Sequence, residues 1–131
     1  MTSTSLEFEE RPLAEALSPL LEEARNERAD LQNQARALRN KAEEAETALR
    51  AREHDLAFLD SLIMELASDN KRVPEYKRLR ETHVEGSGRL QQQSKERRAA
   101  ATAFDERLLA IDREIELLEL GQSKLFQTGR N

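Results

Sequence analysis

The sequence of 131 residues contains no cysteine and no tryptophan, and aromatic residues make up only 4% of it. Without cysteine there is no disulfide framework and no thiol nucleophile. The scarcity of aromatic residues leaves little bulky apolar material for an ordinary globular core. Charged residues, in contrast, reach 36% of the chain, as is typical of long, solvated helices. Together these features favour a single elongated helical domain.

Long hydrophobic runs are also missing. No apolar stretch approaches the ~20 residues that a helix needs to cross a bilayer. Residues 1–5 have neither the basic start nor the hydrophobic core of a signal peptide. We therefore expect no membrane insertion and a cytoplasmic location.

The sequence offers little for catalysis or for ligand binding. His54 and His83 have no second metal ligand three or four residues away. The stretch Gly86-Ser87-Gly88 lacks the Lys-Ser/Thr pair of a phosphate-binding loop. Pairs of acidic residues are abundant, but on so charged a helix they are most simply solvated. We predict no catalytic residue, no cofactor and no metal site.

A heptad pattern between Leu17 and Leu66 organises the chain. Thirteen of its fifteen a and d positions are apolar, and only Arg28 and Arg52 interrupt them. The apolar positions are Leu17, Leu21, Ala24, Leu31, Ala35, Leu38, Ala42, Ala45, Leu49, Leu56, Leu59, Ile63 and Leu66. Such spacing keeps one stripe of a helix against a partner helix. The pattern predicts a helix over about residues 18–68, starting at Ser18 as the N-cap, with Pro19 at the first helical position.

A second helix is predicted over about residues 75–120. Asp69, Asn70 and Pro74 predict a turn before it. The two glycines at 86–88 predict a break within it, because each costs ~1 kcal/mol relative to alanine inside a helix. Gly121 predicts its end. Its apolar stripe consists of Phe104, Leu108, Ile111, Ile115 and Leu118.

The two stripes predict an all-α fold, a long antiparallel two-helix coiled-coil hairpin. Its domains are a flexible acidic leader with a short helical turn (1–17), the hairpin (18–121) and a flexible tail (122–131). Pairing residues whose numbers sum to about 143 places Ala42 against Ala101 and leaves Leu49 and Leu56 opposite serines. These incomplete layers predict that the hairpin oligomerises into a helical bundle.

Charge separates along the chain although the net charge is only -5. Basic residues gather at the turn, whereas acidic residues gather near both termini. We predict that partner proteins contact the basic tip, formed by Lys71, Arg72, Lys77, Arg78 and Arg80. We further predict an apolar patch at the opposite end, formed by Leu6, Phe8, Leu125 and Phe126.

These features predict a non-enzymatic coiled-coil module for protein–protein interaction, an adaptor or structural subunit that binds other proteins and copies of itself. One alternative is a stalk-like or chaperone-like component of a secretion or export machine, since such proteins share the hairpin architecture. Another is a regulator that binds nucleic acid or a polymerase through the basic tip. The negative net charge and the single aromatic residue near the tip, Tyr76, disfavour nucleic-acid binding.

Overall fold

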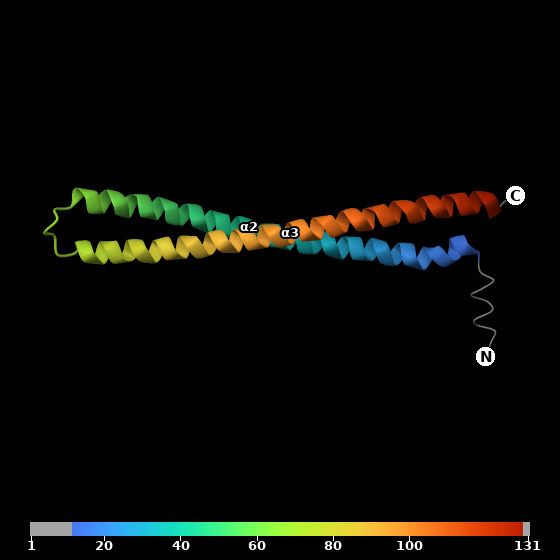
Figure 1. The fold of residues 1–131 in the computed structure, drawn as a ribbon, viewed down its shortest axis with the longest axis horizontal. Coiled ribbons are helices and arrows are strands. Elements are labelled where there is room, and N and C mark those ends of the chain that lie inside the picture. Colours follow the sequence, from blue (N-terminus) through green and yellow to red (C-terminus); the bar gives the residue numbers. More distant parts are fainter. Residues whose placement is uncertain (1–11, 130–131) are drawn as a thin grey trace, which may run out of the picture. The chain divides into compact units, whose positions relative to one another are not determined.

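The computed structural model describes residues 12–129, and it consists of two long helices. Helix α2 spans Leu13–Glu65 and helix α3 spans Val73–Gly129. The two helices run antiparallel and pack against each other, and residues 66–72 connect them (Figure 1). The described residues contain no strand. The predicted all-α helical hairpin is therefore confirmed.

Contacts divide the hairpin into two compact units. The terminal unit takes in the chain up to Ala35 and from Thr102 onward, and the loop unit comprises Arg36–Ala101. Each unit contains one segment of α2 and one of α3. The two units differ in the size of the residues that they bury.

Large aliphatic side chains form the core of the terminal unit. The buried cluster consists of Leu21, Ala24, Leu31, Ile111 and Ile115, against which Phe104, Leu108 and Leu118 pack. All eight belong to the two apolar stripes of the sequence. Removing such side chains from water is the main contribution that holds the two helical segments together.

The loop unit buries mostly small residues. Ala42, Ala45 and Ala101 are almost inaccessible to solvent, and Ser94 is the buried polar residue beside them. Small side chains allow two helix backbones to approach closely, which leaves little space for added volume. Leu59 and Val73 extend this core toward the loop.

Helix α2 begins earlier than the sequence suggested. The amides of Glu15 and Ala16 donate to the carbonyl of Pro12 at 3.0 and 3.1 Å, so the helix is already established at Leu13. The expected start at Ser18 is wrong, and Pro19 lies inside the helix. The turn before Pro19 is held by packing, because Ala14 is 4% exposed in the terminal unit.

The connection between the helices contains the predicted turn. The side-chain oxygen of Asn70 accepts a hydrogen bond from the amide of Arg72 at 2.9 Å, which forms an Asx turn. The carbonyl of Arg72 then accepts from the amides of Glu75 and Tyr76. Pro74 is the second residue of α3, where its missing N–H costs no helical hydrogen bond.

Helix α3 passes through residues 86–88 without the predicted break. Neither glycine has a positive φ, so both adopt ordinary helical backbone. The guanidinium of Arg52, on α2, lies directly over Gly86. Gly86 therefore leaves room for the Arg52 side chain of the neighbouring helix.

Helix α3 also continues past its predicted end. Gly121 lies within the helix, and residues 122–129 extend it, whereas a flexible tail was expected there. The side-chain amide of Gln122 donates to the carbonyl of Ala14 and to Oγ of Ser18, each at 2.8 Å. These bonds fasten α3 to the first turns of α2 beyond the expected helix end.

The pairing of the two helices is shifted from the predicted register. Arg28 contacts Asp112, and Arg80 contacts Asp60. In each of these pairs the two residue numbers sum to 140. The difference from 143 is about one helical turn, which keeps the same helix faces together. It arises because α2 ends at Glu65, before the expected position 68, so that the chain folds back earlier.

The corrected register changes the partners expected for Leu49 and Leu56. A sum near 140 places Leu90 at the level of Leu49, and Val84 at the level of Leu56, where serines were expected. Both α2 leucines are half-buried. Val84 is itself 44% exposed, so the layer at Leu56 is only partly covered, and oligomerisation stays a prediction.

Candidate interaction surfaces

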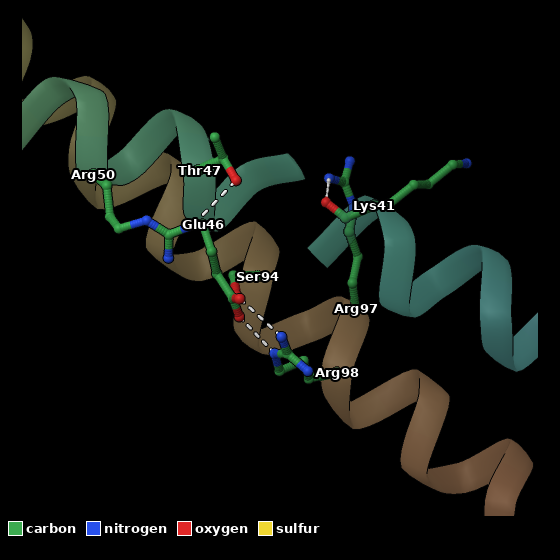
Figure 2. A network of polar contacts seen from close by, with 7 residues as sticks. All are labelled: Lys41, Glu46, Thr47, Arg50, Ser94, Arg97 and Arg98. Atoms are coloured by element: carbon green, nitrogen blue, oxygen red, sulfur yellow. Dashed lines mark hydrogen bonds and ion pairs between the residues drawn. The ribbon is translucent and has the colours of Figure 1, made fainter. Parts of the chain in front are cut away.

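A polar network joins α2 and α3 in the loop unit (Figure 2). The carboxylate of Glu46 accepts two hydrogen bonds from the guanidinium of Arg98, from Nε at 2.5 Å and from Nη2 at 2.8 Å. Ser94 Oγ donates to the same carboxylate at 2.9 Å. Such a bidentate arrangement fixes the relative position of the two side chains as well as attracting them.

The network shifts the acidity of Glu46. The hydrogen bonds from Arg98 and then from Ser94 lower the pKa of the Glu46 carboxyl from 4.5 to about 2. The same pairing raises the pKa of the Arg98 guanidinium. Because Glu46 stays ionised well into acidic solution, the network is a structural link between the helices.

The structure gathers the five residues of the predicted basic tip on the loop and the first turns of α3. All five are exposed, but they differ in their partners. Arg78 pairs with Glu75 at 3.1 Å, and Arg80 pairs with Asp60 on α2 at 2.5 Å. Lys71, Arg72 and Lys77 form no ion pair with any residue of the described chain. These three residues are therefore the available positive charges of the basic tip.

A shallow groove of roughly 550 Å³ lies beside the basic tip, between α2 and α3 of the loop unit. It is lined by Asp60, Ile63, Met64, Lys77, Arg80 and Glu81. Two acidic and two basic residues balance its charge. Met64 is 86% exposed and gives the groove an apolar edge. The groove is open and mixed in character, unlike an enclosed catalytic pocket.

The structure describes two of the four residues of the predicted apolar patch at the chain ends. Leu6 and Phe8 lie outside the described residues. Leu125 is half-buried and Phe126 is 50% exposed, both on the last turns of α3. Whether the four residues form one patch stays a prediction.

An apolar surface that sequence reasoning missed lies on α3 of the terminal unit. Leu109, Leu117 and Leu120 are 71%, 51% and 53% exposed. We name these three residues the outer leucine face. They fall outside the a and d stripe, and their spacing of eight and three residues was the available signal. Exposed leucines on one helical face are typical of an interaction surface.

The two histidines of the described range lie on different helices and have different surroundings. His83 lies 3.7 Å from a carboxylate oxygen of Asp55, and its Nδ1 lies 3.2 Å from the carbonyl of Leu79. His54 is exposed. Within this part of the chain, no group of three or more histidine, aspartate or glutamate residues is arranged to hold a metal ion.

Across the part of the chain that the structure describes, neither helix has a stretch apolar enough to span a membrane. Comparison with protein-family models, with curated proteins and with solved structures finds no match. The function must therefore be inferred from the surfaces of the hairpin.

Proposed function

We propose that the protein is a non-enzymatic helical hairpin that binds other proteins, as an adaptor or structural subunit in the cytoplasm. The observation that carries this proposal is the outer leucine face on α3. Its leucines are exposed to water, although burial of large aliphatic side chains is energetically favourable. A partner that covers these leucines removes them from water, which contributes favourably to the free energy of binding.

The position of these leucines distinguishes them from incompletely packed core. A helix turns by about 100° per residue, so Leu109, Leu117 and Leu120 fall within an arc of roughly 80°. The core residues Ile111 and Ile115 lie on the opposite side of α3. In the terminal unit, α3 therefore packs against α2 on one side and exposes leucines on the other.

Exposed leucines also occur on α2 of the same unit. Leu13 is 60% exposed and Leu20 is 53% exposed, and they are seven residues apart on one face of the helix. Isolated exposed leucines are common on proteins, but several in one small unit favour contact with a partner. The mixed, open groove of the loop unit lends itself less readily to a single ligand.

The proposal is tested by affinity capture from an extract of the native source, with the wild-type chain and the variant Leu109→Gln/Leu117→Gln/Leu120→Gln side by side. We expect proteins that bind the wild-type chain and are lost with the variant. The control is Leu79→Gln, because Leu79 is exposed but lies in the loop unit. Capture of the same proteins by all three chains would refute the role of the outer leucine face.

A further inference from the structure

One edge of the terminal unit is apolar where a leucine of α2 lies opposite a glycine of α3. Leu20 and Gly121 have numbers that sum to 141, so they lie at about the same level of the hairpin, as Arg28 and Asp112 do. No atom lies within 4 Å of a Cβ built on Gly121. Leu20 therefore has no side chain opposite it on this edge, and it is exposed.

Four residues define this surface, which we name the leucine edge: Leu13, Leu20, Leu117 and Gly121. Leu13, Leu20 and Gly121 each directly precede an interface residue of their helix, and in an antiparallel pair such positions lie on one side. Leu117 is exposed one turn before Gly121 on the same side of α3. The leucine edge is therefore an apolar strip between the two helices.

The opposite edge of the terminal unit differs, because ion pairs join the helices there. Arg25 pairs with Glu119 at 3.6 Å, and Arg28 contacts Asp112. Arg25, Glu119 and Asp112 each directly follow a core position, which places them on the side away from the leucine edge. The two edges of this unit thus offer different surfaces to a partner.

Two carboxylates face each other on the leucine edge. Glu27 and Glu114 lie one heptad from Leu20 and Gly121, and their numbers also sum to 141. Neither residue forms an ion pair with any other residue in the range 12–129. The residues three or four positions from each of them are apolar or acidic, so neither helix supplies a cation. A positive charge placed between the two carboxylates would remove their repulsion.

We propose that the leucine edge binds a basic amphipathic helix of another protein, which packs as a third helix against α2 and α3. The inference deepens the proposed function and rests on it, because Leu117 belongs to both the outer leucine face and the leucine edge. The levels of Leu20 and Glu27 are about 10.5 Å apart along α2. The partner helix therefore presents a large apolar residue over Gly121 and a lysine or arginine two turns away.

The charge of the whole unit favours the same kind of partner. Within the described chain, the terminal unit holds eleven acidic and five basic residues. Two copies of this unit would repel each other, whereas a basic helix is attracted. A single helix on this edge forms a small interface, so we expect a dissociation constant in the micromolar range.

The test uses fluorescein-labelled helical peptides as probes. Two 18-residue peptides, each about 27 Å long as a helix, carry leucine on one face and differ only in having lysine or glutamate beside it. We expect fluorescence anisotropy to show binding of the lysine peptide that weakens as salt is raised. The glutamate peptide should bind at least about tenfold more weakly. Equal binding of the two peptides, or no binding of the lysine peptide at ~1 mM, would overturn the proposal.

Charge reversal locates the contact. Glu27→Lys/Glu114→Lys should invert the preference, so that the glutamate peptide binds at least about tenfold more tightly than the lysine peptide. The matched control is Glu15→Lys/Glu22→Lys, which changes the net charge equally at exposed residues of the opposite edge and should keep the original preference. The same inversion in both double variants would indicate a general attraction and contradict a site on the leucine edge.

Glutamine substitutions test the apolar contact. Leu20→Gln/Leu117→Gln should weaken binding of the lysine peptide at least about tenfold, because the apolar anchor is lost. Leu109→Gln/Leu120→Gln changes two exposed leucines that lie away from the edge and should leave peptide binding unchanged. Equal losses in these two variants would overturn the proposal. Circular dichroism of each variant verifies that the hairpin is folded.

The outcomes separate this inference from the proposed function. If the triple variant of the outer leucine face loses captured proteins but the wild-type chain binds neither peptide, the proposed function holds and the basic helix is refuted. If the lysine peptide binds as expected but capture is the same for all chains, the leucine edge is supported and the role of the outer leucine face is refuted. Self-association that Leu20→Gln/Leu117→Gln abolishes, without peptide binding, would identify a second copy as the occupant and overturn the inference.

Discussion

The guanidinium of Arg52 occupies the space where a side chain at Gly86 would begin. A Cβ on Gly86 would clash with Nη1 and Cζ of Arg52. Arg52 is an interruption of the apolar row on α2, and Gly86 is an interruption of the helical composition of α3. The two interruptions accommodate each other, because the charged side chain of Arg52 crosses the interface at the position where α3 has no side chain.

This relationship predicts different effects of alanine at the two glycines of residues 86–88. No atom lies within 4 Å of a Cβ built on Gly88. Gly88→Ala should therefore raise the free energy of unfolding by ~1 kcal/mol, the helix propensity difference. Gly86→Ala should gain less, because the Arg52 guanidinium must move away. Urea denaturation of the two variants measures the difference.

A double-mutant cycle provides the control for this comparison. In the background of Arg52→Ala, the space over Gly86 is empty, and Gly86→Ala should regain the full benefit of alanine. Equal stabilisation by Gly86→Ala in both backgrounds would contradict the placement of Arg52 over Gly86.

A second prediction concerns the acid stability of the loop unit. The pKa of Glu46 is lowered to about 2 by Arg98 and Ser94, so the folded protein holds this carboxylate more strongly than the unfolded chain does. The resulting stability is fully present above pH 4.5 and is lost as the pH falls from there toward 2. We expect Glu46→Gln to lower the melting temperature at neutral pH, and the difference from wild type to shrink across this range.

The partner residue supplies the control for the pH prediction. Arg98→Gln removes the same ion pair by changing its basic partner. The part of the pH dependence of stability that is due to this pair should therefore disappear in the Arg98→Gln variant as well. A difference between wild type and Glu46→Gln that stays constant between pH 5 and about 2 would show that the pair does not form in solution.

The helices themselves were readable from the sequence, because heptad spacing is a local property of the chain. Leu21, Leu31, Ile111 and Ile115 were placed on the facing stripes and are buried in the structure. The turn at Asn70 was also readable, since its side chain forms the turn locally. These features depend on neighbours in sequence and were predicted correctly, whereas the start of α2 at Ser18, which was also predicted from local residues, was wrong.

Features that depend on the other helix were not predicted. The continuity of α3 at Gly86 requires knowledge of Arg52, and its continuation past Gly121 involves the bonds that Gln122 makes to α2. The register was missed by about one turn because it depends on where the loop begins. Similarly, the ion pair of Arg80 with Asp60 reduces the charge available at the basic tip, and this follows only from the register.

A third prediction concerns the close approach of the helices in the loop unit. Ala42 is fully buried, so Ala42→Leu adds volume where none is free. We expect a loss of ~1–3 kcal/mol in the free energy of unfolding. The matched control is Ala48→Leu, the same change at an exposed position of the same helix, which should stay within about 0.5 kcal/mol of wild type. Equal midpoints of thermal unfolding for the two variants would contradict the packing of Ala42 against α3.

The last prediction separates the structural and the binding charges of the basic tip. Lys71→Glu/Arg72→Glu/Lys77→Glu should leave the melting temperature unchanged or slightly raised. These residues pair with no acid in the described chain, and acidic residues beside the start of α3 interact favourably with the helix dipole. Arg80→Glu should instead lower the free energy of unfolding by about 0.5–1 kcal/mol, because it replaces an ion pair with Asp60 by a repulsion.

Binding measurements on the same two variants then assign the role of the basic tip. If a protein captured by the wild-type chain contacts this surface, the triple variant should bind it more weakly, with a marked dependence on salt, although its fold is intact. Arg80→Glu, which retains Lys71, Arg72 and Lys77, should bind it nearly as well as wild type. Binding that is equal for the triple variant and the wild-type chain would instead identify the basic tip as a solvated turn and leave the outer leucine face as the interaction surface.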